Sequence, residues 1–171
     1  PKPQNPFHME NYSIFIISIF ISCGFYSFTG ASISREVKTF SVNYFPNKSN
    51  SINPALSSVF TEMLKEHFST QTNLNETEEI GDLSFNGEIT TYTIKPIAIK
   101  ANETARQNRL TIKIKVNFIN KFEEKLNFIS TFSRYKDYPV EENFSSVEEI
   151  YMEEICKELV EDIFNKSVVN W

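Results

Sequence analysis

The sequence predicts an α+β fold in two layers. A four-stranded, mostly antiparallel sheet carries two amphipathic helices on one face, in the order β-α-β-β-β-α. Two segments, 54–70 and 147–168, repeat apolar residues at helical spacing. Four segments alternate apolar and polar residues, which is typical of strands with one buried face: 37–45, 83–94, 110–118 and 126–135. Because hairpins join the last three strands, we expect these three to pair antiparallel.

The composition is that of one globular domain. The 171 residues include 16 Phe and 7 Tyr but only 4 Gly, and the formal net charge is −5. A mildly acidic chain gives no reason to expect nucleic-acid binding. Only two Cys and two His are present, which are too few side chains for us to expect a zinc site or a Cys-His nucleophile pair. We expect no cofactor.

An apolar run ends directly before Cys23. Residues 12–22 carry no charge, and the run is too short to span a bilayer, which needs roughly 20 residues. The small neighbours Ser22 and Gly24 fit a bacterial lipoprotein signal. In such a signal the run is cut away and Cys23 becomes a lipid-bearing N-terminus.

This interpretation divides the chain into three parts: a signal peptide over 1–22 (with 1–8 an extension before Met9), the lipidated Cys and tether over 23–36, and a single α+β domain over 37–171. Two features depart from the usual signal. Phe20 stands where lipoprotein signals usually have Leu, and the segment after Met9 carries Glu10 but no Lys or Arg. A plain cleaved signal, a short anchor and a buried strand stay open as alternatives.

The strand predicted over 37–45 leads into the first helix. Asn53 can cap this helix, and Pro54 suits its first turn because an N–H is not needed there. His67 falls at the helix end beside Phe68, and no second metal ligand is evident, so we interpret it as a boundary residue. The apolar stripe of the helix consists of Leu56, Val59, Phe60, Met63, Leu64 and Phe68.

The next three strands form consecutive hairpins. In the strand over 83–94 the alternation shifts at Thr90 and Thr91, which predicts a β-bulge. Gly87 in the same strand predicts close packing of another group over it. The strand over 110–118 alternates most regularly. Polar loops are expected over 95–109 and 136–144.

The last helix has a long apolar stripe and an acidic opposite face. Ser146 and Glu149 have the spacing of a capping box at its start. Cys156 falls on the apolar stripe, and we interpret it as a small buried thiol with no disulfide to Cys23.

The two helices can cover one face of the sheet, which leaves the other face open and polar. A right-handed crossover through the first helix would place the first strand parallel to the second. Lys113 and Lys115 share the open face, and further basic residues fall in the adjoining loop: Lys95, Lys100, Arg106 and Arg109. These side chains could contact the phosphates or carboxylates of an anionic lipid. The alternative is a solubilising face that discourages edge pairing.

No pattern predicts catalysis. Neither GxGxxG nor a P-loop occurs, and the paired glutamates fall in predicted turns or on a helix face, where charge is usually solvated. We therefore expect that the protein is not an enzyme. A hydrolase with an unrecognised site would need a pocket that gathers Ser or Glu with His67.

Several stretches together resemble the lipopolysaccharide-assembly outer-membrane lipoprotein family (LptE-like) over nearly all of the chain after Cys23. These stretches are 23–33 (CGFYSFTGASI), 37–40 (VKTF), 44–47 (YFPN), 87–90 (GEIT), 108–112 (NRLTI), 132–135 (FSRY), 162–166 (DIFNK) and 170–171 (NW).

The resemblance implies an outer-membrane lipoprotein on the periplasmic side. Family members partner a large β-barrel translocon, sit partly inside it as a plug, and help deliver lipopolysaccharide to the outer leaflet. The resemblance also implies a fold of two helices on a small sheet. Only Cys23 carries over as a functional residue. The alternative function is a periplasmic lipid-binding or pilot lipoprotein of another secretion system.

Overall fold

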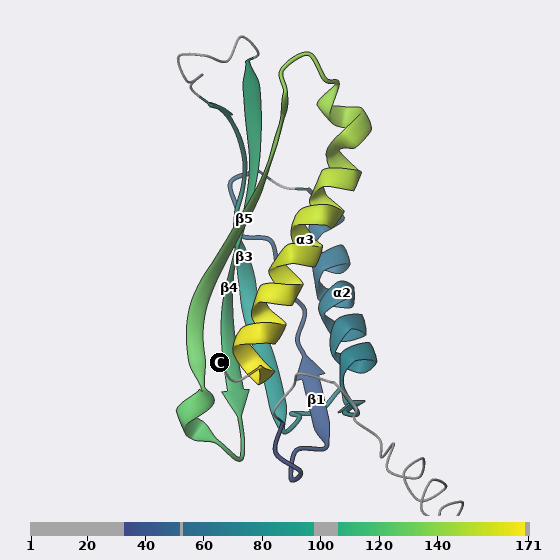
Figure 1. Cartoon of the computed structure of the whole chain (residues 1–171), viewed down its shortest axis with the longest axis vertical. Helices are drawn as coiled ribbons and strands as arrows, with labels where there is room; N and C mark the ends of the chain where they lie inside the picture. The colour runs from purple at the N-terminus through teal and green to yellow at the C-terminus, as the bar shows by residue number, and fades with distance from the viewer. Residues whose placement is uncertain (1–32, 52, 98–105, 170–171) are drawn as a thin grey trace, which may run out of the picture.

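The computed structural model describes residues 33–51, 53–97 and 106–169. They form a five-stranded sheet with two helices packed on one face (Figure 1). The elements in chain order are β1 Thr39–Val42, α2 Leu56–Gln71, β2 Asn75–Glu76, β3 Leu83–Ile97, β4 Gln107–Asn120, a 3₁₀ turn η2 Glu124–Leu126, β5 Phe128–Pro139 and α3 Phe144–Val168. The predicted α+β class and the two helices are confirmed.

The sheet is mixed, and its spatial order is β2-β1-β3-β4-β5. β1 runs parallel to both β2 and β3, while β3, β4 and β5 form antiparallel pairs. The predicted parallel pairing of the first two long strands is confirmed. The predicted count of four strands is wrong, because Asn75 and Glu76 add a fifth strand of two exposed residues. So short a polar segment cannot show the alternation by which strands are recognised.

β3 contains the predicted bulge. Its register with β4 shifts between Ile89 and Thr91, so that Ile89 before the shift and Tyr92 after it are both buried. Gly87 lies in the middle of β3, where an added Cβ would be 2.1 Å from the Lys115 carbonyl oxygen and 2.5 Å from the Phe45 ring. The predicted close packing over this glycine is confirmed, and Phe45 is the group that packs there.

Two connections are shorter than predicted, because the strands are longer. β3 continues to Ile97 and β4 begins at Gln107, so part of the expected loop over 95–109 is hairpin strand at both ends. β5 continues to Pro139, which leaves only 140–143 before α3. Tyr138, expected in a loop, is buried and stacks on Phe144 with ring centroids 5.3 Å apart. The polar residues at these strand ends do not show the alternation by which strands are recognised.

The predicted start of the first helix is confirmed in part, and that of the last helix is wrong. The Asn53 side-chain oxygen accepts hydrogen bonds from the Ala55 and Leu56 amides, but α2 begins at Leu56, two residues after Pro54, and its N-cap position is Ala55. α3 begins earlier than expected, with Asn143 as its cap accepting from the Ser145 amide. Ser146 already lies in the first turn, where its hydroxyl donates to the Asn143 carbonyl. The predicted Ser146–Glu149 capping box is therefore wrong.

The core lies between the sheet and the two helices, and aromatic rings dominate it. Phe68 is fully buried and contacts three other rings, with centroids 5.7 Å from Phe40, 4.6 Å from Phe85 and 5.1 Å from Phe164. Val59 and Met63 of the predicted α2 stripe are half-buried. The other four stripe residues are fully buried: Leu56, Phe60, Leu64 and Phe68.

The prediction that Cys156 is a buried thiol is confirmed. It is fully buried and is a free cysteine within the part of the chain that the structure describes. Burial raises the pKa of this thiol to about 12, so it stays protonated at physiological pH.

Candidate functional site: the open face of the sheet

The face of the sheet opposite the helices is open to solvent over β3, β4 and β5. Along β4 the even-numbered residues from Leu110 to Phe118 are buried against the helices, which turns Lys113 and Lys115 to the open face. Both lysines are exposed. The alternation therefore predicted correctly which side chains reach this face.

Lys113 and Lys115 are surrounded mainly by hydroxyl groups. In the ladder, Lys113 lies between Thr91 of β3 and Ser133 of β5. Lys115 lies between Glu88 and Thr131. Neither lysine forms a salt bridge with any residue in the described ranges. Two unpaired ammonium groups beside three hydroxyls can donate hydrogen bonds to phosphate or carboxylate oxygens.

Two of the other predicted basic residues, Lys95 and Arg109, lie further along the same face. Lys95 and Arg109 are direct cross-strand partners within the β3–β4 hairpin. Arg109 and Lys113 are four positions apart on β4, which corresponds to roughly 14 Å along a strand. Arg106 is exposed just before β4, and Lys100 lies outside the described residues. The structure therefore arranges the basic residues as a stripe along β4 rather than as a compact cluster.

Arg109 is already engaged within the protein. Its Nε and one terminal nitrogen donate to the Asp137 carboxylate at 2.6 and 2.8 Å. Its guanidinium lies 3.7 Å from the centre of the Tyr135 ring. The hydrogen bond to Asp137 raises the pKa of Arg109. The Asp137 carboxylate neutralises the charge of Arg109, so Arg109 attracts a lipid anion less strongly than Lys113 or Lys115 does.

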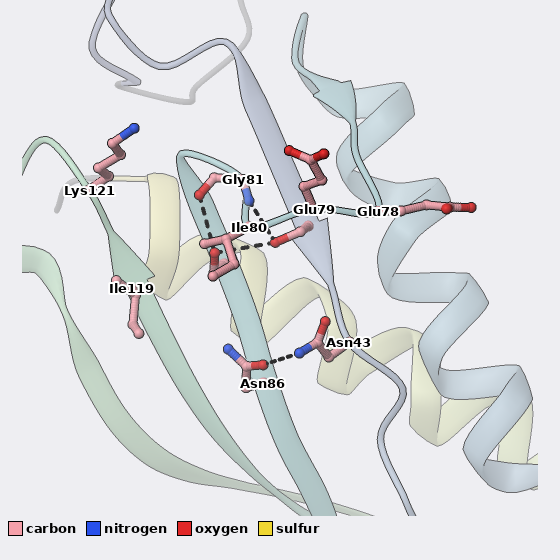
Figure 2. A pocket seen from close by; sticks show the side chains of 10 residues that line it. Asn43, Glu78, Glu79, Ile80, Gly81, Asn86, Ile119 and Lys121 are labelled. Atoms are coloured by element: carbon pink, nitrogen blue, oxygen red, sulfur yellow. Dashed lines mark hydrogen bonds between the residues drawn. The ribbon is translucent and has the colours of Figure 1, made fainter.

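A hollow that the sequence did not predict lies at the opposite end of this face. It has a volume of about 520 Å³ (Figure 2). Its floor contains Asn43 and Asn86, whose amides are hydrogen-bonded to each other, and Ile119 and Lys121 of the β4 end stand on one side. The turn carrying Glu79, Ile80 and Gly81 stands over it.

Serine hydroxyls hold this turn against the sheet. The Gly81 amide donates to the Ser41 hydroxyl at 3.1 Å, and the Ser84 hydroxyl donates to the Gly81 carbonyl at 3.2 Å. A Cβ on Gly81 would be 2.7 Å from the Phe40 carbonyl carbon. Gly81 was the one indication in the sequence that this turn packs against the sheet, because a glycine permits such close approach of two backbones.

His67 lies on the helix side, away from this face. Its ring packs edge-on against Phe164 at 4.8 Å, and burial lowers its pKa. His67 and Glu66 line a second, shallow hollow on the helix side, but no described residue hydrogen-bonds to the imidazole. The nearby hydroxyl of Thr70 donates to the backbone carbonyls of Glu66 and His67. This is the arrangement of a boundary histidine and brings no nucleophile to the ring.

The remaining predictions fall outside the described residues. Cys23, the signal peptide over 1–22 and most of the tether over 23–36 belong to this group. Within the described ranges, no helix is long and apolar enough to cross a membrane.

The fold is similar to that of several solved structures. A minor lipoprotein from Acinetobacter baumannii superimposes with a TM-score of 0.51 at 12% identity, over 77% of this chain and 92% of that one. A neuraminyllactose-binding hemagglutinin homolog from Helicobacter pylori gives 0.51 at 10% identity, over 83% and 89%. Rare lipoprotein B from Shewanella oneidensis gives 0.48 at 11% identity, over 75% and 92%.

The chain belongs to the LptE lipopolysaccharide-assembly family, whose profile matches residues 37–167. The match spans both helices and all five strands, apart from the last residue of α3. No curated protein matches the sequence. The family resemblance noted in the sequence is confirmed, and with it the assignment to the lipoproteins of lipopolysaccharide assembly in the outer-membrane envelope.

Proposed function

We propose that this protein is a non-enzymatic outer-membrane lipoprotein that assists lipopolysaccharide transport as the partner and plug of a β-barrel translocon. The observation that supports this most is the family match over residues 37–167. The role requires binding and placement, and it requires no bond to be made or broken in the lipid.

Placement depends on Cys23 in this proposal. Residues 1–22 are removed, and Cys23 carries the acyl chains that hold the protein at the periplasmic face of the outer membrane. One acyl chain binds a membrane only marginally, so the anchor carries two or more. The tether over 23–36 spans at most roughly 50 Å when extended, which sets how far the domain over 37–171 reaches from the membrane.

Binding depends on the open sheet face. Lys113 and Lys115 contact the phosphate groups of lipopolysaccharide, because both are exposed and unpaired among the described residues. Lys95 extends the site along the hairpin. Arg109 contributes less, because the Asp137 carboxylate already neutralises it.

Extraction of the protein from its own membrane in mild detergent tests the proposed placement and partner. We expect a β-barrel protein to co-purify, and mass spectrometry of the mature N-terminus to find an acylated Cys23. A protein without a barrel partner contradicts the plug role. If depletion leaves surface lipopolysaccharide unchanged, a pilot lipoprotein of another secretion system becomes the better assignment.

A further inference from the structure

A polar pocket lies where the end of α2 meets the segment that leads into β1. It has a volume of about 280 Å³. Residues 33–38 form one side of this pocket, and residues 71–74, which begin at the last residue of α2, form the other. Neither Lys113 nor Lys115 lines it, so it is separate from the open face of the sheet.

The two sides of the pocket are fixed to each other and to the core. The Asn75 amide donates to the Lys38 carbonyl at 3.0 Å, which joins the two segments. Val37 is buried, and Ile33 and Leu74 pack against the hydrophobic core. The pocket therefore has an apolar floor, and its polar side chains form a rim around that floor.

Four rim side chains are rich in N–H donors: Arg35, Lys38, Gln71 and Asn73. All four residues are exposed. None of their side chains has a hydrogen-bond or salt-bridge partner within the described ranges. A guanidinium, an ammonium group and two carboxamides around one small pocket can bind a phosphate group through charge-assisted hydrogen bonds.

No carboxylate of the described residues lines this pocket. Asp82 lies close to the backbone of Lys38, but its carboxylate accepts from the Lys38 and Thr39 amides at 2.9 and 3.1 Å and is outside the lining. Glu36, which lies between the two cations in the sequence, is also outside the lining. The pocket is therefore positively charged in a chain whose net charge is −5.

The alternative is that Arg35 and Lys38 serve only to neutralise the carbonyl end of α2. Neither side chain donates to a carbonyl of α2 among the described residues. The Phe68 carbonyl accepts instead from the amide and the hydroxyl of Thr72, at 3.1 and 2.6 Å. The helix end is capped without the two cations, which leaves them free to bind an external anion.

The position of the pocket indicates which anion it meets. The segment that leads into β1 and the end of α2 lie at one end of the domain, and the β3–β4 hairpin extends from the other end (Figure 1). The tether contains Phe25, Tyr26 and Phe28, and aromatic residues are enriched at membrane–water interfaces. Phe28 and Ile33 are five positions apart, which is at most roughly 18 Å. In the proposed placement, lipid headgroups are therefore within reach of the pocket.

We propose that this pocket binds the phosphate group of a membrane phospholipid through its four rim side chains. The choice of a membrane lipid rests on the proposed anchor at Cys23, whereas the phosphate-binding groups do not depend on that anchor. The contact holds one end of the domain at the leaflet that carries the anchor. It leaves the hairpin end and the open sheet face of a single copy free for the barrel and for lipopolysaccharide.

Binding in mixed micelles tests the pocket separately from the anchor. The detergent-solubilised full chain carries Cys23→Ser, so no acyl chain is attached at this position. Micelles of a non-ionic detergent contain phosphatidylglycerol as the probe. We expect the backbone amide NMR signals of Val37 and Thr72, which lie in the pocket, to shift in a saturable way as phosphatidylglycerol is added.

Two double variants distinguish a built site from a general attraction of anions. Arg35→Ser with Lys38→Ser removes both cations and should weaken phosphatidylglycerol binding at least about tenfold. Gln71→Ala with Asn73→Ala leaves the charge unchanged but removes two neutral donors, and it should weaken binding about fivefold. Unchanged binding by either folded variant overturns the proposal.

The matched control is Lys48→Ser with Lys157→Ser. It makes the same change in net charge at exposed positions outside the pocket, and it should bind like the parent chain. An equal loss of binding in this control overturns the proposal, because the attraction would then depend on net charge alone.

Two further arms identify the source of the phosphate. Inorganic phosphate at the same concentration should leave the Val37 and Thr72 signals unchanged, and an equal response to it overturns the assignment to a lipid. Lys113→Glu with Lys115→Glu should leave the phosphatidylglycerol response of these two signals intact. If that variant abolishes the response, the pocket proposal fails. Loss of lipopolysaccharide binding alone in that variant bears only on the proposed function of the open face.

Discussion

At the scale of single residues, the structure leaves little space for larger side chains where the sheet meets the helix layer. Gly87 allows the Phe45 ring to lie directly against β3, and the Cys156 side chain, midway along α3, is buried in the core. Both positions were identified from the sequence, because a glycine inside a strand indicates close packing and a thiol on an apolar stripe indicates burial. The ring that covers Gly87 could not be identified, since it comes from a different segment.

Gly87→Ala should destabilise the protein strongly. The added methyl would overlap the Lys115 carbonyl and the Phe45 ring, and the backbone and a fully buried ring would both have to move. We expect a loss of about 3 kcal/mol in the free energy of unfolding, measured by urea titration. Thr93→Ala, on the exposed face of the same strand, should change it by less than about 0.5 kcal/mol. Equal stability of the two variants would show that Phe45 does not pack on Gly87.

The Cys156 thiol should be unreactive in the folded protein. Its pKa of about 12, against an ordinary value of 9.0, keeps it protonated until the chain unfolds. Unfolding therefore releases a proton between these two pH values, and this thiol lowers the stability as pH rises through that window. In a Cys23→Ser chain, Ellman's reagent should label Cys156 only in concentrated urea. Rapid labelling of the native protein would contradict its burial.

At the scale of elements, periodicity identified both helices, four of the five strands and the bulge. It failed at the ends of β3, β4 and β5, where polar residues interrupt the alternation. It also failed at the start of α3. Both Asn143 and Ser146 fit a helix cap by residue type, and the packing of Phe144 on Tyr138 decides between them.

The start of α3 gives a test by two alanine variants. Asn143→Ala removes the side-chain oxygen that accepts from the Ser145 amide, and we expect a loss of about 1 kcal/mol in the free energy of unfolding. Ser146→Ala removes only a hydroxyl that bonds back to a carbonyl within the first turn, so its cost should be smaller. The reverse order in thermal or urea unfolding would indicate the capping box that the sequence suggested.

At the scale of the whole molecule, the two layers differ in charge. The outer surface of the helices carries many carboxylates, while the open sheet face carries the stripe of Lys95, Lys113 and Lys115. The sequence predicted that Lys113 and Lys115 share a face, and it placed Lys95 in the adjoining loop. It could not predict that Asp137 neutralises Arg109 or that the 78–81 turn forms a hollow, because both depend on register between distant segments.

The most direct test is binding of purified lipopolysaccharide by the double variant Lys113→Glu with Lys115→Glu. Each lysine near an anionic lipid surface contributes about 1 kcal/mol, so we expect affinity to fall at least about tenfold. The matched control is Lys125→Glu with Lys157→Glu, which makes the same change in net charge at exposed positions off this stripe. Retained binding in the control and lost binding in the double variant is the predicted result. Unchanged binding by a folded Lys113→Glu, Lys115→Glu protein would contradict the proposed role of the open face.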